Sequence, residues 1–186
     1  MPQENPVASQ RPSSDLIDLV IEQWGREMPG MDVDSIRVLG RLHRCDVRYQ
    51  ALVTETLAEF DLTTPAFDVL ASLRRSGPGY RRTAGELAQV GLITTGGLTQ
   101  RIDRLEKAGL VRRAKDEHDR RVVYIELTEA GRDLIDRVVE KHFRTQERML
   151  GTLRQSERRE LARLLSRLEV SLDVFDHLRE DDAATA

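Results

Sequence analysis

Two short helices and a strand pair are encoded by residues 83–127, TAGELAQVGLITTGGLTQRIDRLEKAGLVRRAKDEHDRRVVYIEL. The letters TAGE at Thr83 have the spacing of a capping box, which predicts that a helix starts there. A second helix is predicted over residues 94–108 and is stopped by Gly109, the glycine that often follows a helix end. Residues 110–127 then alternate like two strands around a polar tip. A helix, a turn, a helix and a hairpin in this order predict a winged helix-turn-helix.

Helices are predicted on both sides of this region, near Thr64 before it and after Thr128 behind it. Apolar residues recur every three or four positions from 34 to 60, which predicts a long helix with one buried stripe that includes Cys45. A last helix is predicted from Ser156. Its apolar residues are spaced by 4, 3, 4 and 3 positions, as in a coiled-coil seam: Leu161, Leu165, Leu168, Leu172 and Phe175. Such a seam needs a partner, and self-association is the simplest expectation.

The charge of the chain is unevenly distributed. The net charge is −3, and the 33% charged and 4% aromatic residues favour helices. Residues 74–121 carry 12 Lys and Arg against six Asp and Glu, whereas the rest of the chain carries 17 against 26. One basic region in an otherwise acidic chain suits a protein that presents one face to DNA phosphates.

Several classes of protein are disfavoured by the sequence. No apolar run approaches the roughly 18 residues that cross a membrane, and the start lacks the order of a signal peptide, so we expect a cytoplasmic protein without membrane contact. Cys45 is the only cysteine, and a lone cysteine in an apolar stripe is more simply a packing residue than a redox sensor. The four histidines lack metal-ligand spacing, and no catalytic motif occurs. We therefore expect no metal, no cofactor and no enzyme activity.

The second helix of the helix-turn-helix has an inner and an outer face. At about 100° per residue, Leu98, Ile102 and Leu105 share the inner face. The outer face and the helix start are polar, and a helix N-terminus favours phosphate. The candidates for base or phosphate contacts in a major groove are Thr94, Thr95, Gly96, Thr99, Gln100 and Arg104. The alternative is a solvated polar face.

The hairpin tip combines acidic and basic residues. An acidic side chain beside an arginine holds the guanidinium ready to enter a minor groove. Arg120 or Arg121 is therefore the expected groove residue, and Asp119 is expected to hold it. A charged tip without a partner is the alternative.

Four segments follow one another in a recognisable order: TGGLTQRIDRLEKAGLV at 95–111, Asp116, DRR at 119–121 and LTEAG at 127–131. Together they resemble the MarR family of transcriptional regulators, and the resemblance spans about residues 34–175. It implies an obligate dimer in which each winged lobe reads half of a pseudopalindromic operator. The chain departs from the family pattern in the wing, where no proline follows Asp116, and at Arg82, where an apolar residue is usual.

A narrower resemblance rests on Trp24, on FDVL at 67–70, and on Arg101 and Arg113, together with LRRSGP at 73–78. These residues are similar to the urate-responsive branch of the family and its relative that responds to citrate-like acids. The resemblance implies a binding site for a small anion at Trp24, Asp68, Arg101 and Arg113. Arg101 also lies at the edge of the inner helix face, which fits an ion pair or ligand contact better than a groove contact. Asp68 is then expected to hold Arg101 until an anion competes for it, whereas the alternative is an ion pair without ligand.

The expected fold is mainly α with a small β-hairpin, a winged helix-turn-helix between N- and C-terminal dimerisation helices. Its parts are a disordered tail at 1–14, dimerisation helices that also form a ligand-pocket wall at 15–60, the DNA-binding lobe at 61–127, further dimerisation helices at 128–180 and a tail at 181–186. We expect a repressor that an anion such as urate or a citrate- or aconitate-like acid releases from double-stranded DNA. Two alternatives remain open: a sensor of phenolic or aromatic acids, and a helical protein-interaction module without ligand response. Only a regulator should bind duplex DNA in a strongly salt-dependent way.

Overall fold

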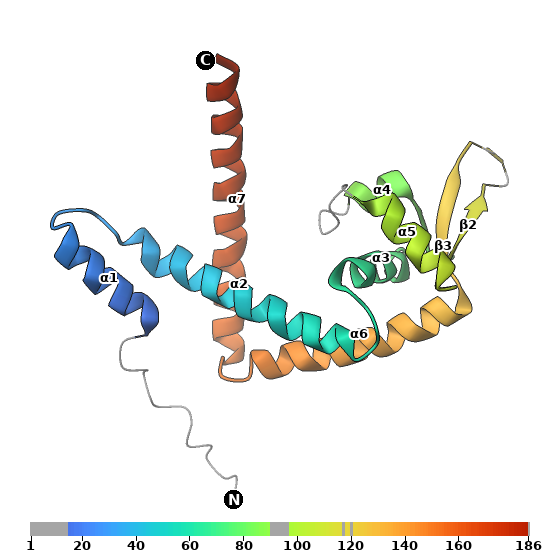
Figure 1. Ribbon diagram of the computed structural model, residues 1–186, viewed down its shortest axis with the longest axis horizontal. Coiled ribbons are helices and arrows are strands. Elements are labelled where there is room, and N and C mark those ends of the chain that lie inside the picture. The colour runs from blue at the N-terminus through green and yellow to red at the C-terminus, as the bar shows by residue number, and fades with distance from the viewer. Residues whose placement is uncertain (1–14, 90–96, 117, 120, 186) are drawn as a thin grey trace, which may run out of the picture. The chain divides into compact units, whose positions relative to one another are not determined.

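The computed structural model describes residues 15–89, 97–116, 118–119 and 121–185 (Figure 1). The chain divides into two compact units, residues 1–145 and 146–186. As predicted, the described residues form a mainly helical structure with a small antiparallel sheet. Its elements in chain order are α1 Leu16–Glu27, α2 Ser35–Ala58, α3 Thr64–Arg74, β1 Arg81–Thr83, α4 Ala84–Gln89, α5 Leu98–Lys107, β2 Val111–Lys115, β3 Val123–Leu127, α6 Glu129–Met149 and α7 Gln155–Thr185. Within these ranges, no helix is long and apolar enough to span a membrane.

An ion-pair network joins α1 to α2. The Asp15 carboxylate caps α1 by accepting the backbone N–H groups of Ile17 at 2.9 Å and Asp18 at 3.1 Å. Arg41 of α2 donates from Nε to Asp15 at 3.0 Å and from Nη2 to Asp18 at 2.8 Å. Gly40 lets the helices approach closely, because a Cβ there would lie 3.0 Å from Ile17 Cδ1. Residues on both helices therefore fix how α1 lies on α2.

The hydrophobic core of the first unit lies between the end of α2, helices α3 to α6 and the sheet. Its fully buried apolar members come from six elements: Leu57, Val69, Leu70, Leu73, Leu87, Ile102, Val111, Ile135 and Val138. Burying one such leucine contributes about 1.5–3 kcal/mol. This core holds the helix-turn-helix and the wing as one lobe.

The sheet has three strands in the order β1-β3-β2, all antiparallel. Strands β2 and β3 are the predicted hairpin, and Arg113 pairs with Ile125 in its register. Strand β1 was not predicted. It is only three residues long and follows Tyr80, whose φ of 47° makes a sharp turn, so it has no alternating pattern to detect.

The predicted stripe on α2 is buried only near the end of the helix. Val53 and Leu57 are buried, whereas Leu39 is 47% exposed and Tyr49 is 39% exposed. Cys45 is also exposed, so the prediction that it packs in a buried stripe is wrong for the single chain. The reason is that the core contacts only the last turns of α2.

The second unit consists of the end of α6, a turn and α7. Arg158 ties this turn together by donating to Glu147 Oε2 at 2.7 Å and to the carbonyls of Leu150 and Leu153 at 2.9 and 3.1 Å. Helix α7 continues to Thr185, so most of the tail expected at 181–186 is helical. Four seam residues are 42–57% exposed in the single chain: Leu161, Leu165, Leu172 and Phe175.

Candidate DNA interface and ligand pocket

The predicted capping box starts the first helix of the helix-turn-helix. The backbone N–H of Glu86 donates to Thr83 Oγ1 at 3.2 Å, and the Glu86 carboxylate accepts the backbone N–H of Thr83 at 2.7 Å. These hydrogen bonds hold the pKa of Glu86 below its usual value. The prediction of a helix start at this point is confirmed.

Helix α5 has the predicted inner face. Its start at Gly97 has a φ of 79°, a left-handed conformation that favours glycine. Leu98, Ile102 and Leu105 are 6%, 2% and 4% exposed, and they pack into the core. The candidates Thr99, Gln100 and Arg104 are exposed on this helix, whereas Thr94, Thr95 and Gly96 lie outside the described residues.

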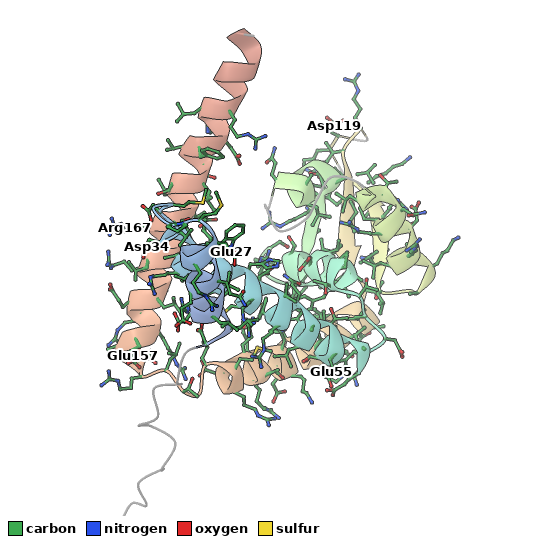
Figure 2. All side chains as sticks on the ribbon, turned by 60° about the vertical axis from the view of Figure 1, so that its left-hand side comes forward. Glu27, Asp34, Glu55, Asp119, Glu157 and Arg167 are labelled. Carbon is green, nitrogen blue, oxygen red and sulfur yellow. The ribbon has the colours of Figure 1, made fainter. Side chains whose placement is uncertain are left out.

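The wing turn is organised by two aspartates. Asp116 Oδ1 accepts the backbone N–H groups of His118 at 2.9 Å and Asp119 at 3.0 Å, which holds the pKa of Asp116 below its usual value. An aspartate turn therefore closes the wing, which lacks the proline usual in the family. Asp119, labelled at the wing in Figure 2, accepts the backbone N–H of Arg121 at 2.9 Å. It thus shapes the turn at Arg121, an exposed residue, while Arg120 lies outside the described residues.

Arg113 of β2 is bound to two carboxylates on α5. Its Nη2 donates to Asp103 Oδ1 at 2.6 Å, and its Nη1 donates to Glu106 Oε2. The Arg113 backbone N–H also donates to Glu106 Oε1 at 3.1 Å. The hydrogen bond to Asp103 and the charge of Glu106 raise the pKa of Arg113. The sequence assigned Arg113 to a ligand, but did not identify these partners.

The Asp68 carboxyl of α3 lies within electrostatic range of Arg75 and Arg101. Burial raises the pKa of the Asp68 carboxyl, and the positive charges of Arg75 and Arg101 offset part of that effect. A half-buried carboxylate of α3 therefore lies in the electric field of an arginine of the predicted recognition helix.

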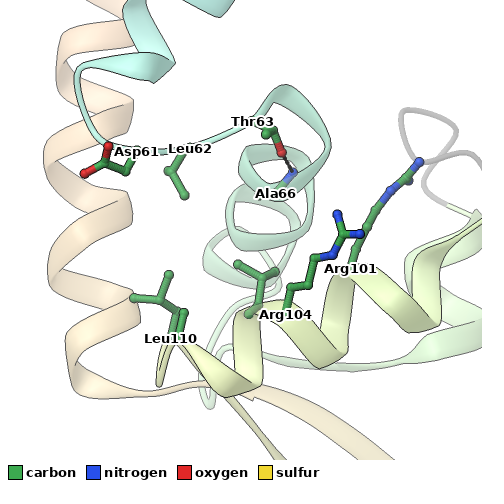
Figure 3. A pocket seen from close by; sticks show the side chains of 9 residues that line it. Asp61, Leu62, Thr63, Ala66, Arg101, Arg104 and Leu110 are labelled. Atoms are coloured by element: carbon green, nitrogen blue, oxygen red, sulfur yellow. Dashed lines mark hydrogen bonds between the residues drawn. The ribbon is translucent and has the colours of Figure 1, made fainter.

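A cavity of about 190 Å³ lies where the α2–α3 connection meets α5 (Figure 3). Leu62, Leu105 and Leu110 are among its apolar lining residues, and Thr63 adds a hydroxyl. Arg101 and Arg104, three residues apart on α5, also line it. In Figure 3 the Arg104 side chain runs toward α3, whereas the Arg101 side chain extends away from Leu62 and Leu110. Residues three apart on a helix are neighbours, so this arginine pair was visible in the sequence, but its cavity was not.

The four residues of the expected ligand site differ in their surroundings. Trp24 is 44% exposed on α1, and Arg113 is engaged with Asp103 and Glu106. Among the described residues, no hydrogen bond, ion pair or ring contact joins Trp24 to Asp68 or Arg113. Within the part of the chain that the structure describes, the charge of Arg101 acts on the Asp68 carboxyl.

Comparison with known proteins supports the same reading of the lobe. A model of the MarR family matches residues 60–122. The chain is 37% identical over 153 residues to the HTH-type transcriptional regulator PecS of Dickeya dadantii, which covers 82% of this chain and 92% of that protein. Curated relatives of this kind are transcriptional regulators, which are not enzymes.

Solved structures show the same fold. AbsC, a MarR family transcriptional regulator from Streptomyces coelicolor, is 28% identical with a TM-score of 0.66, over 77% of this chain and 97% of that chain. BpsR from Bordetella bronchiseptica, whose DNA binding is regulated by 6-hydroxynicotinic acid, is 27% identical with a TM-score of 0.65. The match covers 75% of this chain and 98% of BpsR. The chain therefore belongs to the MarR family of winged helix-turn-helix, DNA-binding transcriptional regulators.

Proposed function

We propose that this regulator is a homodimeric repressor that a small organic anion releases from a pseudopalindromic operator. One observation carries the ligand response: Arg101 belongs to α5, lines the cavity and is attracted by Asp68. An anion in the cavity would compete with Asp68 for Arg101. The helix that reads DNA would then respond directly to the ligand.

Dimerisation is supported by apolar helix faces that the single chain leaves exposed. These faces lie on α1, on the first part of α2 and along α7. The two halves of α7 carry opposite charge: residues 155–168 contain four Arg and two Glu, whereas residues 169–182 contain six Asp and Glu and one Arg. An antiparallel pair of α7 helices would bring each basic half against an acidic half, which favours a second copy as the partner.

DNA binding is proposed to use the start and outer face of α5 in the major groove and the wing in the minor groove. The proposed contact residues are those of the sequence prediction: Thr94, Thr95, Gly96, Thr99, Gln100, Arg104, Asp119, Arg120 and Arg121. Asp119 acts indirectly, by holding the turn that presents Arg121.

The cavity suggests the kind of ligand. At about 190 Å³ it is smaller than the roughly 300–1,000 Å³ of sites for drug-sized molecules, so it suits a compact metabolite. Two arginines favour a carboxylate or urate anion, and the leucine lining favours a flat or short apolar body. Urate and citrate- or aconitate-like acids supply the negative charge that the arginines favour. An aromatic acid, the class of the BpsR effector, fits both and is the second candidate.

Fluorescence polarisation on DNA from upstream of the protein's own gene tests this proposal. Urate, citrate, cis- and trans-aconitate, salicylate and 6-hydroxynicotinate are added in turn to wild type, Arg101→Ala and Arg112→Ala. Arg112→Ala is the control, because Arg112 lies on β2 and bonds Glu126. Release by one acid in wild type and control, but not in Arg101→Ala, supports the ligand site. Tight DNA binding that no acid relieves would refute the ligand response, and an absence of salt-dependent binding would favour the protein-interaction module.

A further inference from the structure

The contacts of Arg113 join the two elements that are proposed above to contact DNA, α5 and the wing. Asp103 and Glu106 lie three residues apart on α5, and Arg113 lies on β2, which leads into the wing. The guanidinium bonds both carboxylates, and Glu106 also binds the Arg113 backbone. We refer to this set of three residues as the α5–β2 bracket.

The bracket is suited to fixing orientation. A planar guanidinium that forks between two carboxylates restricts both distance and angle, unlike a single ion pair. The backbone hydrogen bond to Glu106 adds a contact that does not depend on the Arg113 rotamer. The apolar core residues that α5 and the sheet share, such as Leu105 and Val111, make contacts that are not directional.

We propose that Arg113 is a positioning residue that sets the angle of the recognition helix relative to the wing, so that both reach their grooves together. It touches neither DNA nor effector in this role. The inference rests on α5 and the wing reading DNA, as proposed above. Base readout depends on helix placement, whereas non-specific binding depends on total charge, so Arg113 should affect sequence discrimination more than general affinity.

Arg112 is the matched control. It is the next residue of β2, but successive strand residues point to opposite faces, and Arg112 bonds Glu126 at 2.9–3.0 Å. Arg112→Ala therefore removes the same charge from the same strand without touching α5. The pair of variants separates loss of the bracket from loss of positive charge.

The experiment measures binding of wild type, Arg113→Ala, Arg113→Lys and Arg112→Ala to the upstream duplex and to a shuffled duplex, at several salt concentrations. For both Arg113 variants we expect operator affinity to fall about tenfold relative to the shuffled duplex, because Lys keeps the charge but cannot bond both carboxylates in a fork. The slope of log affinity against log salt concentration should change no more in the Arg113 variants than in Arg112→Ala. Melting curves identify any variant that fails to fold, in which case Arg113→Lys carries the test.

A double variant, Asp103→Asn with Glu106→Gln, separates the two explanations because each predicts a change in a different quantity. It removes two negative charges from α5, so a purely electrostatic role predicts tighter binding to both duplexes, whereas loss of the bracket predicts reduced discrimination. Hydrogen exchange on the free protein should also be faster in α5 and β2 of Arg113→Lys than in wild type.

Three outcomes would overturn the inference. If Arg113→Lys behaves as wild type and Arg113→Ala weakens both duplexes equally with a salt slope lower by about 1, Arg113 is a phosphate contact. If discrimination and exchange are unchanged in every variant, the bracket has no positioning role. If wild type itself does not distinguish the two duplexes, the proposed function fails, and this inference fails with it.

Discussion

Replacing Gly131 with alanine should destabilise the winged lobe through a single steric conflict. Gly131 lies in the first turn of α6, and a Cβ there would be 1.9 Å from the carbonyl oxygen of Leu110 and 2.9 Å from its carbonyl carbon. Both are backbone atoms, so no side-chain rotation relieves the clash. The same carbonyl accepts the backbone N–H of Thr128 at 3.1 Å, and this bond would be strained as α6 moves away.

The magnitude follows from three effects. Overpacking costs about 1–3 kcal/mol, and the strained hydrogen bond costs about 1 kcal/mol. Alanine regains about 1 kcal/mol of helix propensity over glycine. The net loss of about 1–3 kcal/mol corresponds to a drop of roughly 2–12 °C in Tm for a chain of this size.

Thermal unfolding followed by circular dichroism, at one fixed protein concentration, measures this effect. Gly85→Ala in α4 is the control, because a Cβ there would meet only Thr83 Oγ1 at 4.0 Å, and it should keep or raise Tm. A Gly131→Ala protein that melts at or above the wild-type temperature would refute the argument from close approach.

Three further predictions concern pH, the seam and a helix cap. Burial lowers the pKa of His142, whose ring lies 4.9 Å from that of Phe67 and 5.8 Å from that of Phe143, so the folded state binds fewer protons than the unfolded state. Stability should therefore fall as pH drops below about 6.5. In that range the free energy of unfolding in urea should depend less on pH in His142→Phe than in wild type. An equal pH dependence in the two proteins would count against this effect of His142. Leu172→Asp should give a monomer in sedimentation velocity if the seam dimerises, and an intact dimer would contradict that reading. Thr128 Oγ1 accepts the backbone N–H of Gly131 at 3.0 Å. Thr128→Ala should therefore lower the free energy of unfolding, measured in urea, by about 1 kcal/mol. A change below a few tenths of a kcal/mol would refute the capping role.

Local signals in the sequence predicted most of the fold. The start of α3 at Thr64, the capping box at Thr83 and the hairpin all depend on residues close in sequence, and the structure confirms them. Strand β1 escaped prediction because three residues carry no period, and its pairing with β3 depends on residues more than 40 positions away. The Asp15 cap of α1 was a local signal that was overlooked.

The candidate site was predicted less completely, because its contacts join distant segments. Arg101 was expected at the edge of the buried face because of helical periodicity, and it is half-buried, with its positive charge acting on the Asp68 carboxyl. The partners of Arg113 on α5 depend on how β2 packs against that helix, which no spacing reveals. The exposed half of α2, including Cys45, illustrates the converse case: periodicity identifies an apolar face but not what covers it.

Calorimetric titration of the most effective acid from the release assay, into the free protein and into the protein saturated with operator duplex, tests the central claim most directly. If anion and operator compete through α5, the anion should bind the protein–DNA complex more weakly than the free protein. The factor should equal the factor by which the anion weakens operator binding, about 5- to 150-fold for a coupling of 1–3 kcal/mol. Equal affinity of the anion for the free and the DNA-bound protein would contradict the account.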